Sequence, residues 1–105
     1  MLELRTHWTD PATANVVAEG EIVDPPDEAQ LHDEVCAAVR QHATEVLVDL
    51  TGVRLIGSAG LNALVRAHDE AECLGCGIAV VGATGVVRRA FEITSLTELF
   101  GMDER

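Results

Sequence analysis

The sequence contains no lysine and no tyrosine, and its aromatic residues amount to one Trp and two Phe among 105 residues. All seven basic residues are Arg, against 18 Asp and Glu, so the formal net charge is −11. The first fifty residues carry eleven of those acids and only two of the Arg. A nucleic-acid-binding protein needs a basic surface, because release of counterions from the phosphates supplies much of its affinity. The charge therefore excludes DNA and RNA as ligands, and it disfavours anionic membrane surfaces.

Long apolar stretches and an even set of cysteines are also missing. No apolar run approaches the ~20 residues that cross a bilayer. Residues 1–10 alternate acidic and basic side chains and lack the hydrophobic stretch of a signal peptide. Three cysteines are an odd number, which argues against the disulfide framework of a secreted protein. We therefore expect a cytoplasmic protein of one domain, spanning residues 1–105.

Hydrophobic periodicity divides the chain into strands and helices. Alternation with period two, or a short apolar run, predicts strands over residues 2–8, 16–22, 46–50 and 78–81, with a last edge strand over 96–100. Apolar residues at helical spacing predict helices over 27–43, 58–74 and 86–93. The order β-β-α-β-α-β-α-β is typical of a single α/β domain with a mixed, four- to five-stranded sheet. Because the first two strands keep a charged face, we expect helices mainly over one face of that sheet.

Proline and glycine predict where these elements begin and end. Residues 11–15 are interpreted as a turn, and the segment from Asp24 to Asp27 as a break before the first helix, which Asp27 and Gln30 open with a capping box. The second helix is predicted to begin at Ser58, after a connection through Gly52 and Gly57. Its buried stripe is expected to hold Leu61, Leu64, Val65, His68 and Ala71, and its outer face Asn62, Arg66, Asp69, Glu70 and Cys73.

Ser58 is the most informative single residue, because it lies between a predicted strand and the start of a predicted helix. One interpretation is an N-cap serine that accepts hydrogen bonds from the first free amides of the helix. A serine hydrolase is disfavoured, because the Gly-x-Ser-x-Gly motif needs glycine where this chain has Ile56. A third interpretation is phosphorylation, since the helix macrodipole and the free amides favour a phosphate that adds about two negative charges. The residues alone do not decide between an N-cap serine and a phosphorylated serine.

The remaining motifs give weaker signals of chemistry. Cys73 and Cys76 form a C-x-x-C at the C-terminal end of a predicted helix, where the dipole does not lower a thiol pKa as it does in thioredoxin-like pairs. The four histidines show no metal-ligand spacing, so we expect no metal. Residues 82–85 lack the lysine of a phosphate-binding loop and are interpreted as a turn. No cofactor and no catalytic acid–base pair are predicted, and we expect that the protein is not an enzyme.

Residues 46–61, VLVDLTGVRLIGSAGL, resemble the central motif of STAS domains and are most similar to that of the bacterial anti-sigma factor antagonists, also called anti-anti-sigma factors. The resemblance extends to Gly20-Glu21-Ile22, like the second strand of the family, and to residues 87–96, like its third helix and the following loop. It therefore covers nearly the whole chain, in the order and spacing of the family.

The resemblance implies a partner-switching regulator of transcription. In that family the unphosphorylated antagonist binds an anti-sigma factor, usually a serine kinase of the GHKL ATPase type, and so releases a sigma factor. The kinase phosphorylates the serine that aligns with Ser58, which ends the binding, and a metal-dependent serine phosphatase restores the antagonist. The best-known members have Asp directly before that serine, where this chain has Gly57, and a second serine where it has Ala59.

Transferred to this chain, the resemblance implies partner contacts around the aligned serine. The expected partner-binding residues are Asp24, Gly57, Ser58, Ala59, Gly60, Asn62 and Arg66. An alternative also fits: a STAS module that is never phosphorylated and serves as a structural or interaction subunit of a transporter, lipid-transport or stress-signalling complex. Gly57 in place of Asp favours that alternative.

Overall fold

The computed structural model describes residues 2–102, and these residues form one α/β domain in the order β-β-α-β-α-β-α. The strands are β1 (Glu3–Asp10), β2 (Thr13–Ile22), β3 (Glu45–Ile56) and β4 (Gly77–Val81). The helices are α1 (Pro25–Arg40), α2 (Ser58–Cys73) and α3 (Gly85–Ile93). The predicted fold class is confirmed. None of the helices between residues 2 and 102 is long and apolar enough to cross a membrane.

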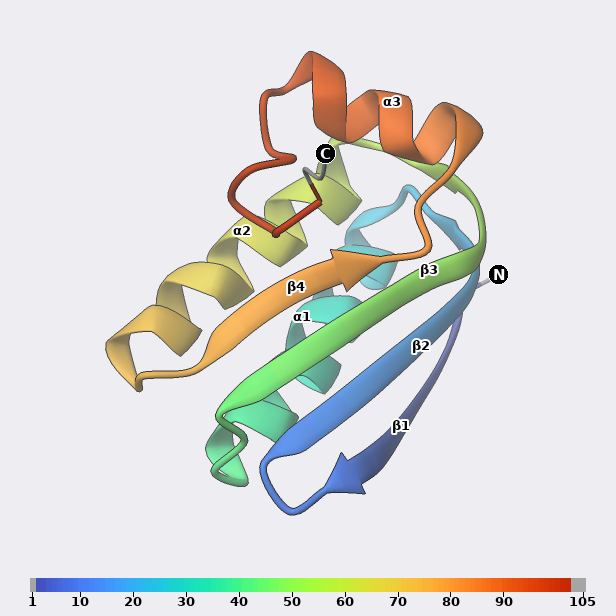
Figure 1. Ribbon diagram of the computed structural model, residues 1–105. Helices are drawn as coiled ribbons and strands as arrows, with labels where there is room; N and C mark the ends of the chain where they lie inside the picture. Colours follow the sequence, from blue (N-terminus) through green and yellow to red (C-terminus); the bar gives the residue numbers. More distant parts are fainter. Residues whose placement is uncertain (1, 103–105) are drawn as a thin grey trace.

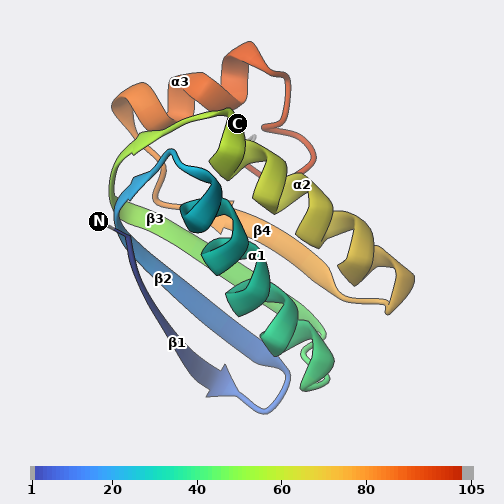
Figure 2. The ribbon, with the colours of Figure 1, turned by 180° about the vertical axis from the view of Figure 1, so that it is seen from behind.

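The four strands form one mixed sheet in the order β1-β2-β3-β4 (Figure 1). β1 pairs antiparallel with β2, whereas β2, β3 and β4 are parallel. Parallel neighbours need a crossover, and α1 and α2 provide the two crossovers from β2 to β3 and from β3 to β4. Figure 2 shows α1 and α2 side by side over one face of the sheet, with α3 at the end where β4 stops. The expectation of helices mainly over one face is therefore confirmed.

The core lies between the sheet and this helical layer. Alternate residues of β2 are fully buried from Ala14 to Ala18, as is Ile22 at its end, and the small side chains of Ala14 and Ala18 let the helices approach the sheet closely. Leu31 and Val35 of α1 and Leu64 of α2 are also fully buried. Each such large side chain contributes about 1.5–3 kcal/mol by leaving water, so this layer supplies most of the stabilisation that positions the helix ends.

α1 begins and ends earlier than its sequence pattern predicts. Asp24 is the N-cap and Pro25 is the first helical residue, a position at which proline loses no hydrogen bond. The carboxylate of Asp27 accepts hydrogen bonds from the backbone N–H of Asp24 and of Val23, so the predicted capping pair of Asp27 with Gln30 is wrong. The helix ends at Arg40 because His42, two residues beyond, has a φ of 74°.

Two predicted connections are strand in the structure. β1 ends at Asp10 and β2 begins at Thr13, so the turn predicted over residues 11–15 consists only of Pro11 and Ala12. β3 continues past residue 50 to Ile56, because the second half of β2 offers a parallel partner as far as the pair Ile22 and Ile56. Gly52 alone predicts the end of the strand, but pairing with β2 keeps the backbone extended through this residue.

The predicted edge strand over residues 96–100 is wrong, because this segment forms turns. The backbone amides of Phe100 and Met102 bond to carbonyls within the segment, which satisfies them without a strand partner. The carbonyl of Phe100 still accepts a hydrogen bond from the Val80 N–H at 2.9 Å. The Phe100 ring is fully buried and meets Phe91 edge to face, so the segment closes the core beside β4.

Candidate functional site

The Ser58 turn lies where β2 and β3 end together. β3 ends at Ile56, and the N–H of Gly57 donates a hydrogen bond to the carbonyl of Ile22, the last residue of β2, at 2.9 Å. The N-cap of α1, Asp24, follows Ile22 by two residues. Because the carboxyl ends of parallel strands meet at one edge, the structure brings Asp24 and the Gly57–Ser58 turn to the same end of the sheet.

Ser58 is the first residue of α2, and its side chain is exposed. The N-cap is Gly57, in an extended conformation with φ of −107°, so the interpretation of Ser58 as the N-cap is wrong. Within residues 2–102 no side chain caps α2, and its first turn contains no acidic residue. The first amides of a helix lack partners within the helix and carry the positive end of its dipole. The Ser58 hydroxyl therefore lies at a helix end that favours an anion.

Gly60 lets α2 start directly on the sheet. It is buried, and a Cβ atom at this position would lie 2.6 Å from Ile56 Cγ1, 2.8 Å from Ile22 Cγ2 and 3.0 Å from the Ile22 carbonyl oxygen. Only glycine fits this approach without a shift of its neighbours. Gly60 thereby allows the Ser58 turn to lie close to the ends of β2 and β3.

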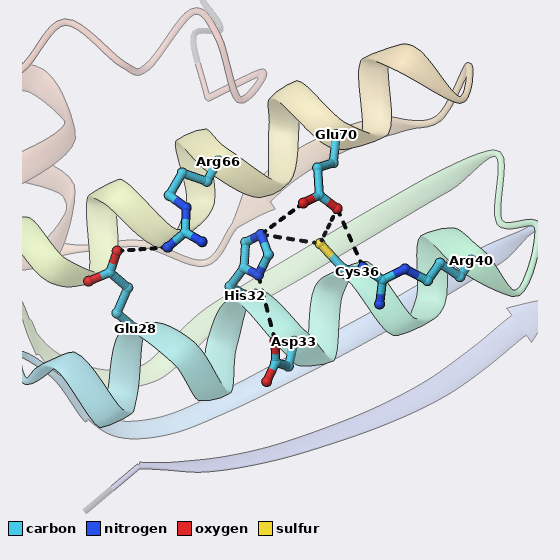
Figure 3. Close-up of polar contacts among 7 residues, drawn as sticks. All are labelled: Glu28, His32, Asp33, Cys36, Arg40, Arg66 and Glu70. Atoms are coloured by element: carbon cyan, nitrogen blue, oxygen red, sulfur yellow. Dashed lines mark hydrogen bonds and ion pairs between the residues drawn. The ribbon is translucent and has the colours of Figure 1, made fainter.

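Asn62 and Arg66 lie on the outer face of α2, as predicted, and both contact α1. Asn62 Nδ2 donates a hydrogen bond to Glu28 Oε2. Arg66 Nη1 lies 3.1 Å from the same oxygen, and Figure 3 shows this ion pair. Glu28 was not among the predicted site residues. The sequence places it 34 residues from Asn62 on another helix, and no local pattern predicts that the two helices bring them together.

A shallow groove runs beside these residues between α1, α2 and the end of α3. Its lining is made by Glu28, Ser58, Ala59, Leu61, Asn62, Val65 and Thr94. Three of the predicted partner-binding residues, Ser58, Ala59 and Asn62, therefore line one groove, whereas Gly60 lies buried beneath them. The groove combines apolar side chains with the Ser58 and Thr94 hydroxyls and one carboxylate, a mixture that suits a protein surface.

The cysteines of the C-x-x-C motif do not form a reactive pair in the structure. Cys73 is exposed at the end of α2, Cys76 is buried, and neither is in a disulfide. Burial raises the pKa of the Cys76 thiol, with a further contribution from the charge of Glu45. A raised pKa keeps the thiol protonated and makes it a poor nucleophile.

The fold and this strand-end turn define the class: a small α/β domain that presents a serine at the start of a helix beside a groove. A family model described as "Mlab, STAS domain" matches residues 8–101. The chain therefore belongs to the STAS domain family. No curated protein matches the chain.

Solved structures with this fold include proteins of two kinds. An anti-sigma factor antagonist from Mycobacterium paratuberculosis is 24% identical, with a TM-score of 0.79 over 95% of this chain and 83% of that one. The Bacillus cell fate determinant SpoIIAA in its phosphorylated form is 14% identical, with a TM-score of 0.73 over 92% and 87% of the two chains. A sulfate transporter family protein from Wolinella succinogenes is 12% identical, with a TM-score of 0.69 over 90% and 74%. The shared property is the fold.

Proposed function

We propose that this STAS domain is an anti-sigma factor antagonist that binds an anti-sigma factor at the groove beside Ser58 and is released by phosphorylation of Ser58. The observation that carries the proposal is the exposed hydroxyl of Ser58 on the first residue of α2, at the edge of the groove. The similarity in fold to anti-sigma factor antagonists supports the same role. The partner would be an anti-sigma factor of the GHKL serine kinase type, and binding it would free a sigma factor for transcription without catalysis by this domain.

The local charges explain how one phosphate could end the binding. A phosphoryl group on Ser58 would gain from the dipole and the first amides of α2, so it would stay at the helix end. It would add about two negative charges to a groove that already contains the Glu28 carboxylate. A partner surface that fits the neutral serine would then meet a bulky anion, which costs desolvation and repulsion. A serine phosphatase would reverse the change.

The test uses the fact that the chain has only two serines, Ser58 and Ser95. Ser58→Asp should abolish binding to the cell's GHKL-type anti-sigma factor in calorimetry, while Ser58→Ala should bind regardless of kinase and ATP. Ser95→Asp is the matched control, because it adds the same charge at another exposed serine outside the groove lining. Tight binding by folded Ser58→Asp, or equal loss in both Asp variants, would contradict the proposal. Phosphosite mapping of protein from its own cells should find phosphate on Ser58 alone.

A second candidate is a STAS module that is never phosphorylated and joins a transporter or lipid-transport complex. Gly57 in the place of the usual acid favours it, as do the "Mlab" description of the family model and the fold of the sulfate transporter family protein. This candidate predicts that Ser58 carries no phosphate during growth or stress and that Ser58→Asp still copurifies with its partners.

A further inference from the structure

A second cluster of side chains joins α1 to α2 away from the Ser58 groove. His32 and Cys36 lie one helical turn apart on α1 and are both buried, and Glu70 reaches them from α2 (Figure 3). Cys36 Sγ lies 3.5 Å from His32 Nε2 and 3.2 Å from Glu70 Oε1, and His32 Nε2 lies 3.4 Å from Glu70 Oε2. An imidazole nitrogen, a thiol sulfur and a carboxylate thus converge on one point.

These separations are close to those between ligand atoms around a zinc ion, with Cys36 Sγ and His32 Nε2 at two corners and the Glu70 carboxylate at the third. With bonds of about 2.3 Å to sulfur and about 2.0–2.1 Å to nitrogen and oxygen, tetrahedral zinc holds its ligand atoms about 3.3–3.6 Å apart. Sγ and Nε2 lie 3.5 Å apart, within that range. Glu70 Oε1 lies 3.2 Å from Sγ and Oε2 lies 3.4 Å from Nε2, so rotation of the half-exposed carboxylate would bring one oxygen to the third corner. Spacing among the four histidines gave no sign of this site, because only one histidine takes part and the third ligand comes from another helix.

The surroundings also resemble those of a metal site. His32 Nδ1, the nitrogen that points away from the cluster, lies 3.7 Å from Asp33 Oδ1, beyond hydrogen-bond distance but on the side where metal sites place an outer carboxylate (Figure 3). Glu70 is half exposed, so a fourth ligand can enter from solvent. The Arg40 guanidinium lies 3.7 Å from Glu70 Oε1 and opposes a cation, but it is largely exposed and can turn away.

We propose that His32, Cys36 and Glu70 form a binding site for one Zn²⁺ ion, with a fourth position open to water or to an external ligand. In the structure the Cys36 thiol donates a hydrogen bond to Glu70, and zinc would take the place of that proton as the link between the three groups. The ion would hold α1 against α2 at the middle of their contact. The site is independent of the role proposed for Ser58.

The test is a zinc titration of the whole chain under reducing conditions, followed by calorimetry and by competition with a chromogenic chelator. We expect one Zn²⁺ per chain and a higher melting temperature with zinc. Co²⁺ in place of zinc should give thiolate-to-metal charge-transfer absorption. His32→Gln and Cys36→Ser should each weaken the affinity by at least about tenfold and remove the gain in melting temperature, with circular dichroism showing that each variant is folded.

Two control variants fix the position of the site. Cys73→Ser removes the exposed cysteine, and His68→Gln removes a member of the other candidate cluster, His68, Asp69 and Glu72. Both should bind zinc like the unmodified chain. The proposal fails if the chain binds no stoichiometric zinc, if both ligand variants bind unchanged, or if only the control variants lose binding.

Discussion

Replacing Gly60 with alanine tests whether close contact of α2 with the strand ends sets the position of the Ser58 turn. Alanine favours the helix over glycine by about 0.5–1 kcal/mol, so an unconstrained site would gain stability. The added Cβ, however, would lie 2.6 Å from Ile56 Cγ1 and 2.8 Å from Ile22 Cγ2. Carbon atoms prefer separations of about 3.5–4.0 Å, so both contacts are too short by about 1 Å.

The neighbours of Gly60 have little room to move. The Ile22 carbonyl oxygen would lie 3.0 Å from the new Cβ, and it already accepts the hydrogen bond from the Gly57 N–H. Overpacking of this kind costs about 1–3 kcal/mol. Because two contacts would fall below 3.0 Å, the cost lies in the upper half of that range, about 2–3 kcal/mol. After subtraction of the helix gain of about 0.5–1 kcal/mol, Gly60→Ala should lower the free energy of unfolding by about 1–2.5 kcal/mol. For a domain of this size, that loss lowers the melting temperature by about 4–20 °C.

The assay is thermal and urea unfolding followed by far-ultraviolet circular dichroism, with Gly57→Ser as the matched control. A Cβ at Gly57 would meet Val23 only at 3.8 Å, and serine is a better N-cap than glycine by a few tenths of a kcal/mol. The control should therefore be slightly more stable than the unmodified chain. A Gly60→Ala variant as stable as the unmodified chain would refute the close packing of this helix start.

Two further predictions concern the core and the response to alkaline pH. Phe100→Ala should lower the free energy of unfolding by about 3–5 kcal/mol, because the ring is fully buried and its centroid lies 6.0 Å from that of Phe91. If urea unfolding gives a free energy within about 1 kcal/mol of that of the unmodified chain, the last turns do not close the core. Burial, and then the hydrogen bond and charge of Glu70, raise the pKa of Cys36 from 9.0 to about 11. The contribution of this thiol to stability is therefore complete below pH 9 and is lost as the pH rises toward about 11. Unfolding measured between about pH 8 and about pH 10.5 should show a decline that Cys36→Ala lacks, and an equal decline in both proteins would contradict it.

The helices and strands with a strong local sequence pattern could be predicted from the sequence. The errors fall where contacts with other segments determine the secondary structure. The apolar run of residues 46–50 and the helical spacing after Ser58 need no tertiary information. The extension of β3 through Gly52 depends on β2, whose backbone lies alongside. Residues 96–100 are apolar enough for a strand, but their amides find carbonyl partners within the turn.

The candidate sites divide in the same way. Ser58 could be found because a strand end, a helix start and a family motif coincide in one stretch of sequence. Glu28 and Glu70 could not, since each acts on a residue of the other crossover helix. Surface glutamates are common in this acidic chain, and nothing local distinguishes these two from the others.

The contacts between α1 and α2 are of two kinds, buried apolar contacts and a row of polar contacts. The buried apolar side chains between the helices supply the stabilisation, whereas an exposed ion pair such as Glu28 with Arg66 contributes about 0–1 kcal/mol. Glu28 and His32 follow one another on successive turns of α1, as Arg66 and Glu70 do on α2, so their contacts form one polar row along the helix pair (Figure 3). The close-packed apolar side chains already favour one register of α2 along α1, and the polar row is satisfied in that same register. That register places Ser58 at the end of the groove.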